Sequence, residues 1–421
     1  MSGSLDGLRV VDLSRVLAGP LCAMMLGDHG ADVIKVEPPA GDDTRQWGPP
    51  FAGSEAAGAP EGYRGESAYY LFCNRNKRGM IVDLSRPEGR DVALRLIDRA
   101  DVVVENFKPG TLERWGLGYD DVLRVRNPRL IFASISGFGA DGPYANLPGY
   151  DVLGQAMGGM MSITGEPGAG PTRVGIAIAD ISSGLYAMHA ILLALAARER
   201  TGTGQRVDAS LLESIVSLLT HLASNYLVGG VKPRQYGNSH PSIVPYQLFR
   251  TADGYIYVSV GNDRQFQRLA EQLERPDLAA DERYRTNADR VANRGTLIPA
   301  LEAALAARPT AAWIERFWPT GVPASPVDDL EQVFRNPQVL HREMLLRVDH
   351  PTIADGVPMT GIPIKLRGTP GAIRRHPPLP GEHTREVLRE HGYAEGAIEA
   401  LERAGVVRSW RTAAVTAPAR P

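Results

Sequence analysis

Cysteine is almost missing from this sequence of 421 residues. Only Cys22 and Cys73 occur, far apart and with no Cys/His cluster beside them, so neither a disulfide framework nor a zinc site is expected. The histidines are scattered without the His-x-x-x-His spacing of metal hydrolases, and we predict no metal and no tightly bound cofactor. The low cysteine content is typical of a protein of the reducing cytosol.

An excess of charge of one sign is missing as well. Lys and Arg number 46 against 48 Asp and Glu, so a surface for nucleic acid or anionic membranes has no support. The N-terminus has no secretory signal, and the longest apolar stretch, residues 187–197, is too short to span a bilayer. We therefore expect a soluble, cytoplasmic protein that binds neither nucleic acid nor membranes.

Three common catalytic motifs are also absent. The sequence contains no phosphate loop of the form Gly-x-x-x-x-Gly-Lys-Ser/Thr, no Gly-x-Gly-x-x-Gly fingerprint after the first strand and no Gly-x-Ser-x-Gly elbow. Common nucleotide-binding and serine-hydrolase functions are therefore disfavoured. Any catalysis is expected to depend on carboxylates.

The order of apolar runs and helix signals predicts an α/β fold. Residues 9–13, 20–29 and 33–37 are typical of a strand, a helix and a second strand, and the pattern recurs with a helix at 87–99 and strands at 80–84, 102–105 and 130–136. Short connections between such runs favour a parallel sheet covered by helices. Residues 38–67, rich in Gly, Pro and Ala, are expected to form a long surface loop.

The length and the 43% apolar content predict two domains. A long helix is expected from Asp180 to about residue 200, ended by Thr-Gly-Thr-Gly, and a second helix after Ser210. Residues 227–326, with a strand pair around the Asp253-Gly254 turn, are expected to form a smaller α+β domain. Residues 1–226 and 327–421 are expected to form the large domain, and the tail 411–421 is expected to be disordered.

Asp180 is the leading candidate nucleophile. At the start of a helix, the dipole and the free amides are expected to lower the pKa of its carboxylate and keep it ionised. The alternative is that Asp180 only caps the helix. Tyr150 and Asp151 are equally open, because they could be a site hydroxyl and acid or merely a turn and a cap.

Two further segments could meet an anionic ligand. Asn74–Arg78 holds three cations and is either a ligand site or a solvated loop, while Glu105–Gly110 with Arg114 follows a strand at the edge where open α/β sheets bind ligands. The turn 14–20 ends with Gly19-Pro20 at a helix start, which suits a phosphate but is also an ordinary turn.

Taken in order, these segments resemble the family III CoA-transferases of the CaiB/BaiF type. The resemblance covers residues 5 to about 407. It is carried by LAGP at 17–20, GADVIKVE at 30–37, NRNKR at 74–78, DVVVENF at 101–107 with Pro109-Gly110, SISGFG at 134–139, GYD at 149–151 and TGTGQ at 201–205.

The resemblance implies a large Rossmann-like domain built from both chain ends, an inserted small domain and an interlocked homodimer. It also implies that Asp180 attacks an acyl-CoA thioester, giving a mixed anhydride and then an aspartyl-CoA thioester that an acceptor acid converts to product. Coenzyme A is then part of the substrate. The positions that match the family's CoA contacts are Leu17, Ala18, Val82, Asp83, Leu84, Asn106, Phe107 and Arg114.

The substrate is inferred from the same resemblance. The segments 223–227 and 242–247 are most similar to succinyl-CoA:glutarate transferases, which implies succinyl-CoA as donor and a C4 to C6 dicarboxylic acid as acceptor. Tyr150, Asp151, Asn238 and His240 are the expected substrate-binding residues, with Arg173 or Arg234 as further partners of the distal carboxylate. The segment 237–242 lacks the glycine run of some oxalate-using members.

One departure concerns the nucleotide part of CoA. Some relatives carry Arg after Lys-Val-Glu, where this chain has Pro38, so Arg15 or Arg45 is expected to supply that contact. The alternative functions are a 2-methylacyl-CoA racemase, disfavoured because Tyr150 replaces its histidine base, and a CoA-binding protein without turnover.

Overall fold

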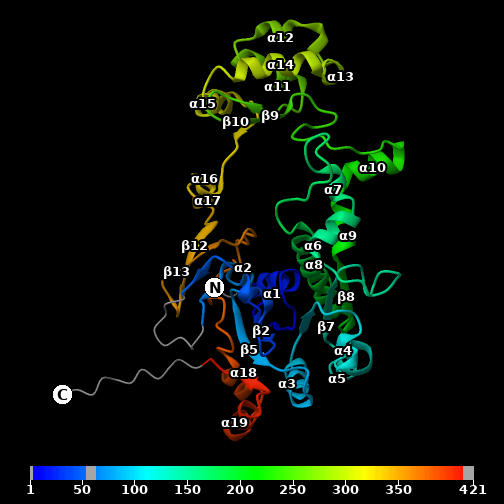
Figure 1. The fold of residues 1–421 in the computed structure, drawn as a ribbon, viewed down its shortest axis with the longest axis vertical. Coiled ribbons are helices and arrows are strands. Elements are labelled where there is room, and N and C mark those ends of the chain that lie inside the picture. The colour runs from blue at the N-terminus through cyan, green and yellow to red at the C-terminus, as the bar shows by residue number, and fades with distance from the viewer. Residues whose placement is uncertain (1–2, 54–62, 411–421) are drawn as a thin grey trace, which may run out of the picture. The chain divides into compact units, whose positions relative to one another are not determined.

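The structure is a computed structural model that describes residues 3–53 and 63–410 (Figure 1). By internal contacts it divides into two compact units. The first unit holds the residues up to Met160, Val174–Thr220 and the residues from Gln338, and the second holds Met161–Arg173 and His221–Pro337. The second unit thus begins earlier in the chain than the predicted small domain, residues 227–326. The predicted disordered tail, 411–421, lies outside the described residues.

The first unit is built on a seven-stranded sheet with the order β14-β5-β2-β1-β6-β7-β8. Its strands are β1 (Arg9–Asp12), β2 (Asp32–Glu37), β5 (Lys77–Val82), β6 (Val102–Glu105), β7 (Ile131–Ser136), β8 (Arg206–Ser210) and β14 (Val407–Arg408). All neighbours are parallel except β14, which pairs antiparallel with β5. The sheet is therefore mixed, whereas the sequence favoured a purely parallel one, because a strand from the chain's far end closes its edge.

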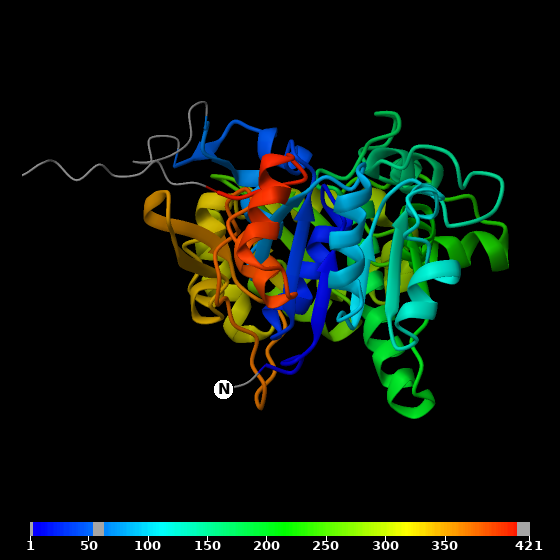
Figure 2. The ribbon, with the colours of Figure 1, turned by 90° about the horizontal axis from the view of Figure 1, so that it is seen from below.

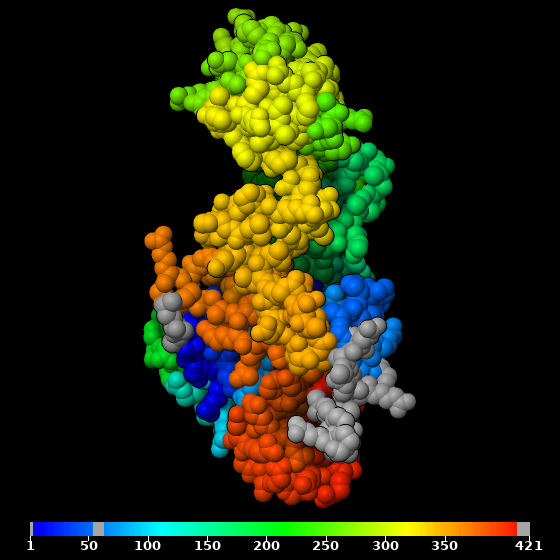
Figure 3. All heavy atoms as spheres, turned by 90° about the vertical axis from the view of Figure 1, so that its left-hand side faces the viewer, coloured from blue at the N-terminus to red at the C-terminus, as the bar shows by residue number. Residues whose placement is uncertain are grey.

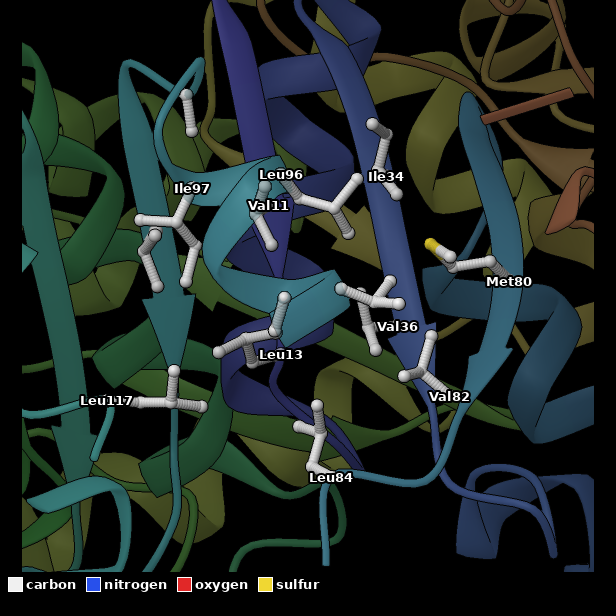
Figure 4. Close-up of a cluster of buried hydrophobic side chains, with 14 of the residues drawn as sticks. Val11, Leu13, Ile34, Val36, Met80, Val82, Leu84, Leu96, Ile97 and Leu117 are labelled. Carbon is white, nitrogen blue, oxygen red and sulfur yellow. The ribbon is translucent and has the colours of Figure 1, made fainter. Parts of the chain in front are cut away.

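Alternate side chains of the strands enter two separate cores. Val11, Ile34 and Val82 face α3 (Pro87–Ile97), α18 (Thr384–Glu390) and α19 (Glu395–Arg403), as Figure 4 shows for α3. Val10 and Val33 pack with α1 (Ala18–Asp28), α8 (Ile178–Thr201) and α9 (Leu211–Leu218) on the opposite side. In Figure 2 the orange to red helices of the first side lie beside the blue strands of the sheet. Because successive strand residues point to opposite faces, the apolar runs predicted as buried strands serve both cores.

The long helix α8 runs from Ile178 to Thr201 and ends at Gly202, whose left-handed φ of 75° is the stop that Thr-Gly-Thr-Gly predicts. Among the described residues, α8 is the one unbroken helix long and apolar enough to cross a membrane, although its inner face, with Ala187 and Ile191, packs on the sheet. The helix of 24 residues is longer than the apolar stretch 187–197, which was predicted to be too short to span a bilayer.

Shorter elements complete the first unit: η1 (Asp43–Gln46), β3 (Phe51–Ala52), β4 (Glu66–Ser67), α2 (Ala68–Cys73), α4 (Thr111–Arg114), η2 (Tyr119–Leu123), α5 (Arg124–Arg126), α6 (Asp151–Met157), β12 (Leu345–His350) and β13 (Ile353–Thr360). Residues near the unit boundaries form α7 (Met160–Ile163), α10 (Thr220–Gly229) and α17 (Pro337–His341). The helices α18 and α19, orange to red in Figure 3, form part of the surface.

The second unit packs helices on a three-stranded antiparallel sheet of order β11-β10-β9. Its strands are β9 (Tyr246–Arg250), β10 (Tyr255–Ser259) and β11 (Ala324–Pro326), and its helices are α11 (Asp263–Gln272), α12 (Pro276–Ala280), α13 (Asn287–Ala292), α14 (Arg294–Leu305), α15 (Thr310–Thr320) and α16 (Leu330–Val333), with η3 at Glu282–Tyr284. Ile256, Phe266 and Trp313 lie in its core. Both predicted strands around Asp253-Gly254 are present.

The segment predicted as a basic cluster, Asn74–Arg78, is buried. Each cation pairs with a carboxylate: Arg75 with Asp28 at 2.7 Å, Lys77 with Asp12 at 2.9 Å, and Arg78 with Asp32 at 2.6 Å. The cluster is therefore neither a phosphate-binding patch nor a solvated loop, and both interpretations were wrong. The basic residues instead anchor the start of β5, which begins at Lys77 rather than at residue 80.

Buried charges continue into the segment 38–67. Lys35 and Asp42 form an ion pair of 2.9 Å that is almost fully buried, and Arg45 bridges Glu37 and Glu66 at 2.7 and 2.8 Å. Burial would raise the pKa of Asp42, but the charge of Lys35 and the hydrogen bonds from Thr44 and Lys35 together outweigh burial and lower the pKa to about 2. The described parts of this segment are thus anchored in the fold and are not simply a surface loop.

Replacing Lys77 should destabilise the protein strongly. Lys77→Met leaves the Asp12 carboxylate buried without its partner, which costs ~3–5 kcal/mol of unfolding free energy. Arg126→Ala, which breaks an exposed pair with Asp98, should cost less than ~1 kcal/mol. Urea-induced unfolding measures both, and equal losses for the two variants would contradict the structural role of the buried pair.

Candidate active site

Asp180 lies in the first turn of α8 but does not cap it. The N-cap position is Ala177, and no side chain of the α8 sequence caps the helix. The cap comes from α6 instead, where Asp151 accepts hydrogen bonds from the Ala179 and Asp180 N–H groups at 2.8 and 3.4 Å. Gln155 donates to the other oxygen of Asp151 at 2.7 Å. The cap that the sequence suggested for Asp180 is thus made by Asp151, which leaves the Asp180 carboxylate available.

The pKa of Asp180 is raised to about 7, first by burial and then by the negative charge of Asp151. The sequence analysis expected a lowered pKa from the helix dipole and the free amides, and this expectation was wrong. Asp151 occupies those amides and brings a like charge to the helix start. Among the described residues, none donates a hydrogen bond to the Asp180 carboxylate, so burial is not offset.

Two close backbone approaches bring the pieces of the site together. Gly137 and Gly149 lie so close that a Cβ on Gly137 would stand 2.4 Å from the Gly149 Cα, which lets the chain leading to Asp151 cross the end of β7. Gly184 packs against the Ala18 carbonyl, 2.6 Å from where its Cβ would be. Because a side chain would force α1 and α8 apart at this point, glycine keeps Ala18 beside the turn that follows Asp180.

The loop between β1 and α1 carries Leu17 and Ala18, two of the predicted CoA contacts. Both side chains are buried, and Leu17 packs with Cys73, Tyr69 and Ile181. Val16, just before them, has a left-handed φ of 70°, which is strained for a β-branched residue. The structure therefore places this predicted segment next to the first turn of α8.

Val82, Asp83 and Leu84 follow β5. Val82 and Leu84 are buried in the core beneath α3, so a ligand could meet only their main chain. Asp83 is partly exposed, and its carboxylate accepts hydrogen bonds from Ser85 N–H and Oγ at 3.0 and 2.5 Å. Of these three predicted contacts, Asp83 alone offers a side chain to solvent.

The segment after β6 holds Asn106, Phe107 and Arg114. The Phe107 ring packs edge-on against Trp115 at 5.4 Å and lies 6.0 Å from the guanidinium of Arg15. Arg114 is exposed, with one hydrogen bond of 3.0 Å to Thr111. These residues share the carboxyl edge of the sheet with the β1–α1 loop, because β1 and β6 are parallel neighbours.

The two candidate replacements for the missing arginine at position 38 differ sharply. Arg45 is buried and donates to Glu37, Glu66 and the Pro378 carbonyl, so its guanidinium is fully engaged. Arg15 is half exposed, with one long ion pair of 3.7 Å to Asp43. The structure thus removes Arg45 from the candidates and leaves Arg15.

Asn238 and His240 belong to the second unit, so their relation to Asp180 stays a prediction. Asn238 donates to Glu166 at 3.2 Å, and His240 stacks on His221 with ring centroids 5.8 Å apart. The pKa of His240 is lowered by burial and further by His221 and Arg294. Tyr150, on the first unit, is 67% exposed and free to meet a ligand.

Sequence reasoning missed Tyr69. Its ring packs in the cluster that contains Ala177 and Ile181, and its pKa is raised to about 12 by burial and then by the Asp180 charge. Trp47 covers it edge-on, with ring centroids 5.1 Å apart. No local pattern in the sequence distinguishes this tyrosine from its neighbour Tyr70, because the difference is made by a contact across the fold.

Fold and site together describe an α/β protein with a partly buried carboxylate in the first turn of α8 that no described side chain pairs with by a hydrogen bond. The model of CoA-transferase family III matches residues 5–384, and the chain belongs to this family. It is therefore a CoA-transferase, which uses CoA thioesters as substrates.

Several characterised relatives are similar over nearly the full length. The chain is 43% identical over 410 residues to succinyl-CoA:glutarate CoA-transferase of Mus musculus, covering 97% of this chain and 91% of the relative. It is 44% identical over 407 residues to succinate–glutarate CoA-transferase of Agrobacterium fabrum, covering 95% and 96%. A crystal structure of a CaiB/BaiF family protein from Brucella suis matches with a TM-score of 0.82 at 43% identity, covering 93% of this chain and all of that one.

Neutralising Asp180 should stabilise the protein at neutral pH. Its folded pKa of about 7 lies above its ordinary value of 3.8, so ionisation destabilises the native state as the pH rises between these values. Asp180→Asn should therefore equal the wild type in stability near pH 4 and exceed it by up to ~4 kcal/mol at pH 8. Urea unfolding at both pH values measures this, and a constant difference would contradict the raised pKa.

Asp151 should raise the pH at which the enzyme becomes active. Its like charge contributes to the raised pKa of Asp180, so Asp151→Asn should move the acid limb of kcat/KM to lower pH by roughly half a unit to one unit. The limb itself should persist, because burial is the larger cause. An unmoved or upward-shifted limb would show that Asp151 does not act on Asp180 electrostatically.

Proposed function

We propose that this enzyme transfers CoA from succinyl-CoA to a C4 to C6 dicarboxylic acid such as glutarate, with Asp180 as the nucleophile. The donor and acceptor follow from the names of relatives that are 43 and 44% identical over almost the whole chain. The single observation that carries the catalytic part is the Asp180 carboxylate, partly buried and unpaired at a helix start that Asp151 has already capped.

A carboxylate in this state suits covalent catalysis. Once ionised, it has lost much of its water shell, and no described neighbour stabilises its charge by a hydrogen bond, so it is more reactive than an exposed carboxylate. Its pKa of about 7 leaves a large fraction ionised at neutral pH. If Asp180 capped the helix, hydrogen bonds from the helix N–H groups would stabilise its charge and make the carboxylate less reactive.

The proposed reaction proceeds in steps that conserve the acyl and CoA groups. An oxygen of Asp180 attacks the thioester carbonyl of succinyl-CoA, CoA leaves as thiolate, and a mixed anhydride remains on the enzyme. The thiolate attacks the Asp180 carbonyl carbon and expels succinate, giving an aspartyl-CoA thioester. The acceptor carboxylate attacks this thioester, releases the thiolate and forms a second mixed anhydride with Asp180. The thiolate attacks the acceptor carbonyl of that anhydride, which gives the product thioester and frees the Asp180 carboxylate.

The remaining predictions fit this scheme as proposals. Leu17, Ala18, Asp83, Asn106, Phe107 and Arg114 form the CoA-binding edge of the large domain, for which we propose the first unit, while Asn238 and His240 serve the acceptor from the small domain. Exposed apolar side chains on α8, such as Leu185 and Leu193, support a homodimer. We expect the two subunits to be interlocked and the protein to be cytoplasmic.

The test is a CoA-exchange assay with succinyl-CoA and separate acids, including glutarate, malate, itaconate, oxalate and acetate. The wild type should form a new dicarboxyl-CoA thioester, identified by mass spectrometry. Asp180→Ala should lower the exchange rate at least about 1,000-fold while still binding CoA, because it removes the nucleophile and not the binding surface.

Asp180→Asn is the matched variant, since it keeps the shape of the side chain and should fail equally. With succinyl-CoA alone, the wild-type peptide that contains Asp180 should gain the mass of CoA less one water, because the thioester replaces the carboxyl hydroxyl. Exchange retained by both variants would remove Asp180 from the mechanism. Deuterium uptake at the α-carbon of a 2-methylacyl-CoA, without any exchange, would favour the racemase alternative.

A further inference from the structure

Asn106, predicted as a CoA contact, uses both polar atoms of its side chain in hydrogen bonds to the protein. Its Oδ1 accepts a hydrogen bond from the Arg15 N–H at 2.9 Å, and its Nδ2 donates to the Arg15 carbonyl at 2.7 Å. The two bonds close a ring between the amide and one residue of the β1–α1 loop. The amide therefore joins the loops that follow β1 and β6, 91 residues apart in the sequence.

Glu105 fixes the direction from which Asn106 reaches the loop. This buried carboxylate accepts hydrogen bonds from the Phe107 N–H at 2.8 Å and from the Ser134 hydroxyl on β7. Both oxygens of Glu105 are thus held at the sheet edge. These bonds anchor the start of the segment after β6, from which the Asn106 amide holds Arg15.

The side chain of Arg15 is the part of this arrangement that is free to bind. Its main chain is held on both sides by Asn106, its guanidinium lies 6.0 Å from the Phe107 ring centroid, and half of its side chain is exposed. Its one ion pair, to Asp43, is long at 3.7 Å and exposed on both sides, so it is weak. Arg15 thus has a main chain held in place and a guanidinium whose donors are largely unused.

We infer that Asn106 is a positioning residue rather than a ligand of CoA, and that it holds Arg15 so that the guanidinium binds a phosphate group of CoA. This inference rests on the CoA site proposed above. Arginine offers two parallel donors to a phosphate, and holding its main chain lowers the entropy lost on binding. It also accounts for Pro38, since Arg15 supplies the cation that this chain lacks there.

The chemistry of an amide is required at position 106. The main chain of Arg15 presents one donor and one acceptor, and only Asn offers the complementary pair at this length. Asn106→Asp replaces the Nδ2 donor by an oxygen that faces the Arg15 carbonyl, so it should be worse than Asn106→Ala. Asn106→Asp would also be the worse variant if Asn106 contacted a phosphate directly, because the new carboxylate would repel it. Variants of Arg15 are therefore needed to separate the two roles of Asn106.

The deciding experiment is a double-mutant cycle on the equilibrium dissociation constant of CoA, measured by calorimetry with CoA alone. Arg15→Gln should weaken binding about tenfold, because a charged donor to phosphate is lost. Asn106→Ala should weaken it about three- to tenfold in the wild-type background. In the Arg15→Gln background, Asn106→Ala should have almost no further effect, because the amide acts through Arg15.

Asn127 provides the matched control for a lost amide. Its Nδ2 also ties a loop to main-chain carbonyls, at 2.8 Å from Ala100, but it precedes β7 at the opposite edge of the sheet. Asn127→Ala should lower stability about as much as Asn106→Ala without changing CoA binding. Arg124→Gln on α5 is the control for a lost exposed cation and should also leave CoA binding unchanged.

Each outcome decides the inference. Independent, multiplicative effects of the two substitutions would show that Asn106 contacts CoA itself and would overturn it, as would an unchanged dissociation constant for Arg15→Gln. Absence of CoA binding by the wild type would overturn it together with the proposed site. If the wild type binds CoA but exchanges none of the acids, the proposed substrates fail while the cycle still tests Asn106 and Arg15.

Discussion

The ion pair between Lys77 and Asp12 is the constraint on which the carboxyl edge of the sheet depends. Both groups are fully buried, and the three protons of the ammonium group meet Asp12, the Pro20 carbonyl and Asn74 at 2.8 to 2.9 Å. A buried ammonium is tolerated only when every proton has a partner, so β1, β5 and the start of α1 must keep their positions relative to one another. These positions determine where the β1–α1 loop lies.

The loop itself is fixed by the same set of buried charges. Asp12 accepts from the Ser14 N–H at 3.0 Å, Lys35 donates to the Ser14 carbonyl at 3.0 Å, and Asp42 accepts from the Val16 N–H at 3.3 Å. These bonds hold Val16 at a left-handed φ of 70°, a conformation that costs of order 1–3 kcal/mol and would relax without them. Strain at the loop and charge beneath it are therefore two parts of one arrangement.

Sequence patterns predicted five of the seven strands of the large sheet, one of them with a shifted start, but not the environment of Asp180, whose role as the nucleophile stays a proposal. The apolar runs predicted β1, β2, β6 and β7 within a residue or two, because burial on both faces leaves a local signal. The edge strand β14 was missed because two residues from the far end of the chain carry no periodicity. The shift predicted for the pKa of Asp180 had the wrong direction, because the cap comes from Asp151, 29 positions earlier. No local sequence rule predicts that contact.

The two errors on charged residues have the same physical origin. In the sequence, the segment Asn74–Arg78 contains three cations and Asp180 stands at a predicted helix start. The charge environment of both was inferred from neighbouring residues in the chain and not from residues that the fold brings close. In the fold, the cations at 75, 77 and 78 are neutralised by carboxylates from α1, β1 and β2, while Asp180 gains a like charge. Opposite charges thus pair to hold the start of β5, while among the described residues no hydrogen-bond donor offsets the burial of the Asp180 carboxylate. In the mechanism that we propose, this lack of compensation is what leaves the charge of Asp180 reactive.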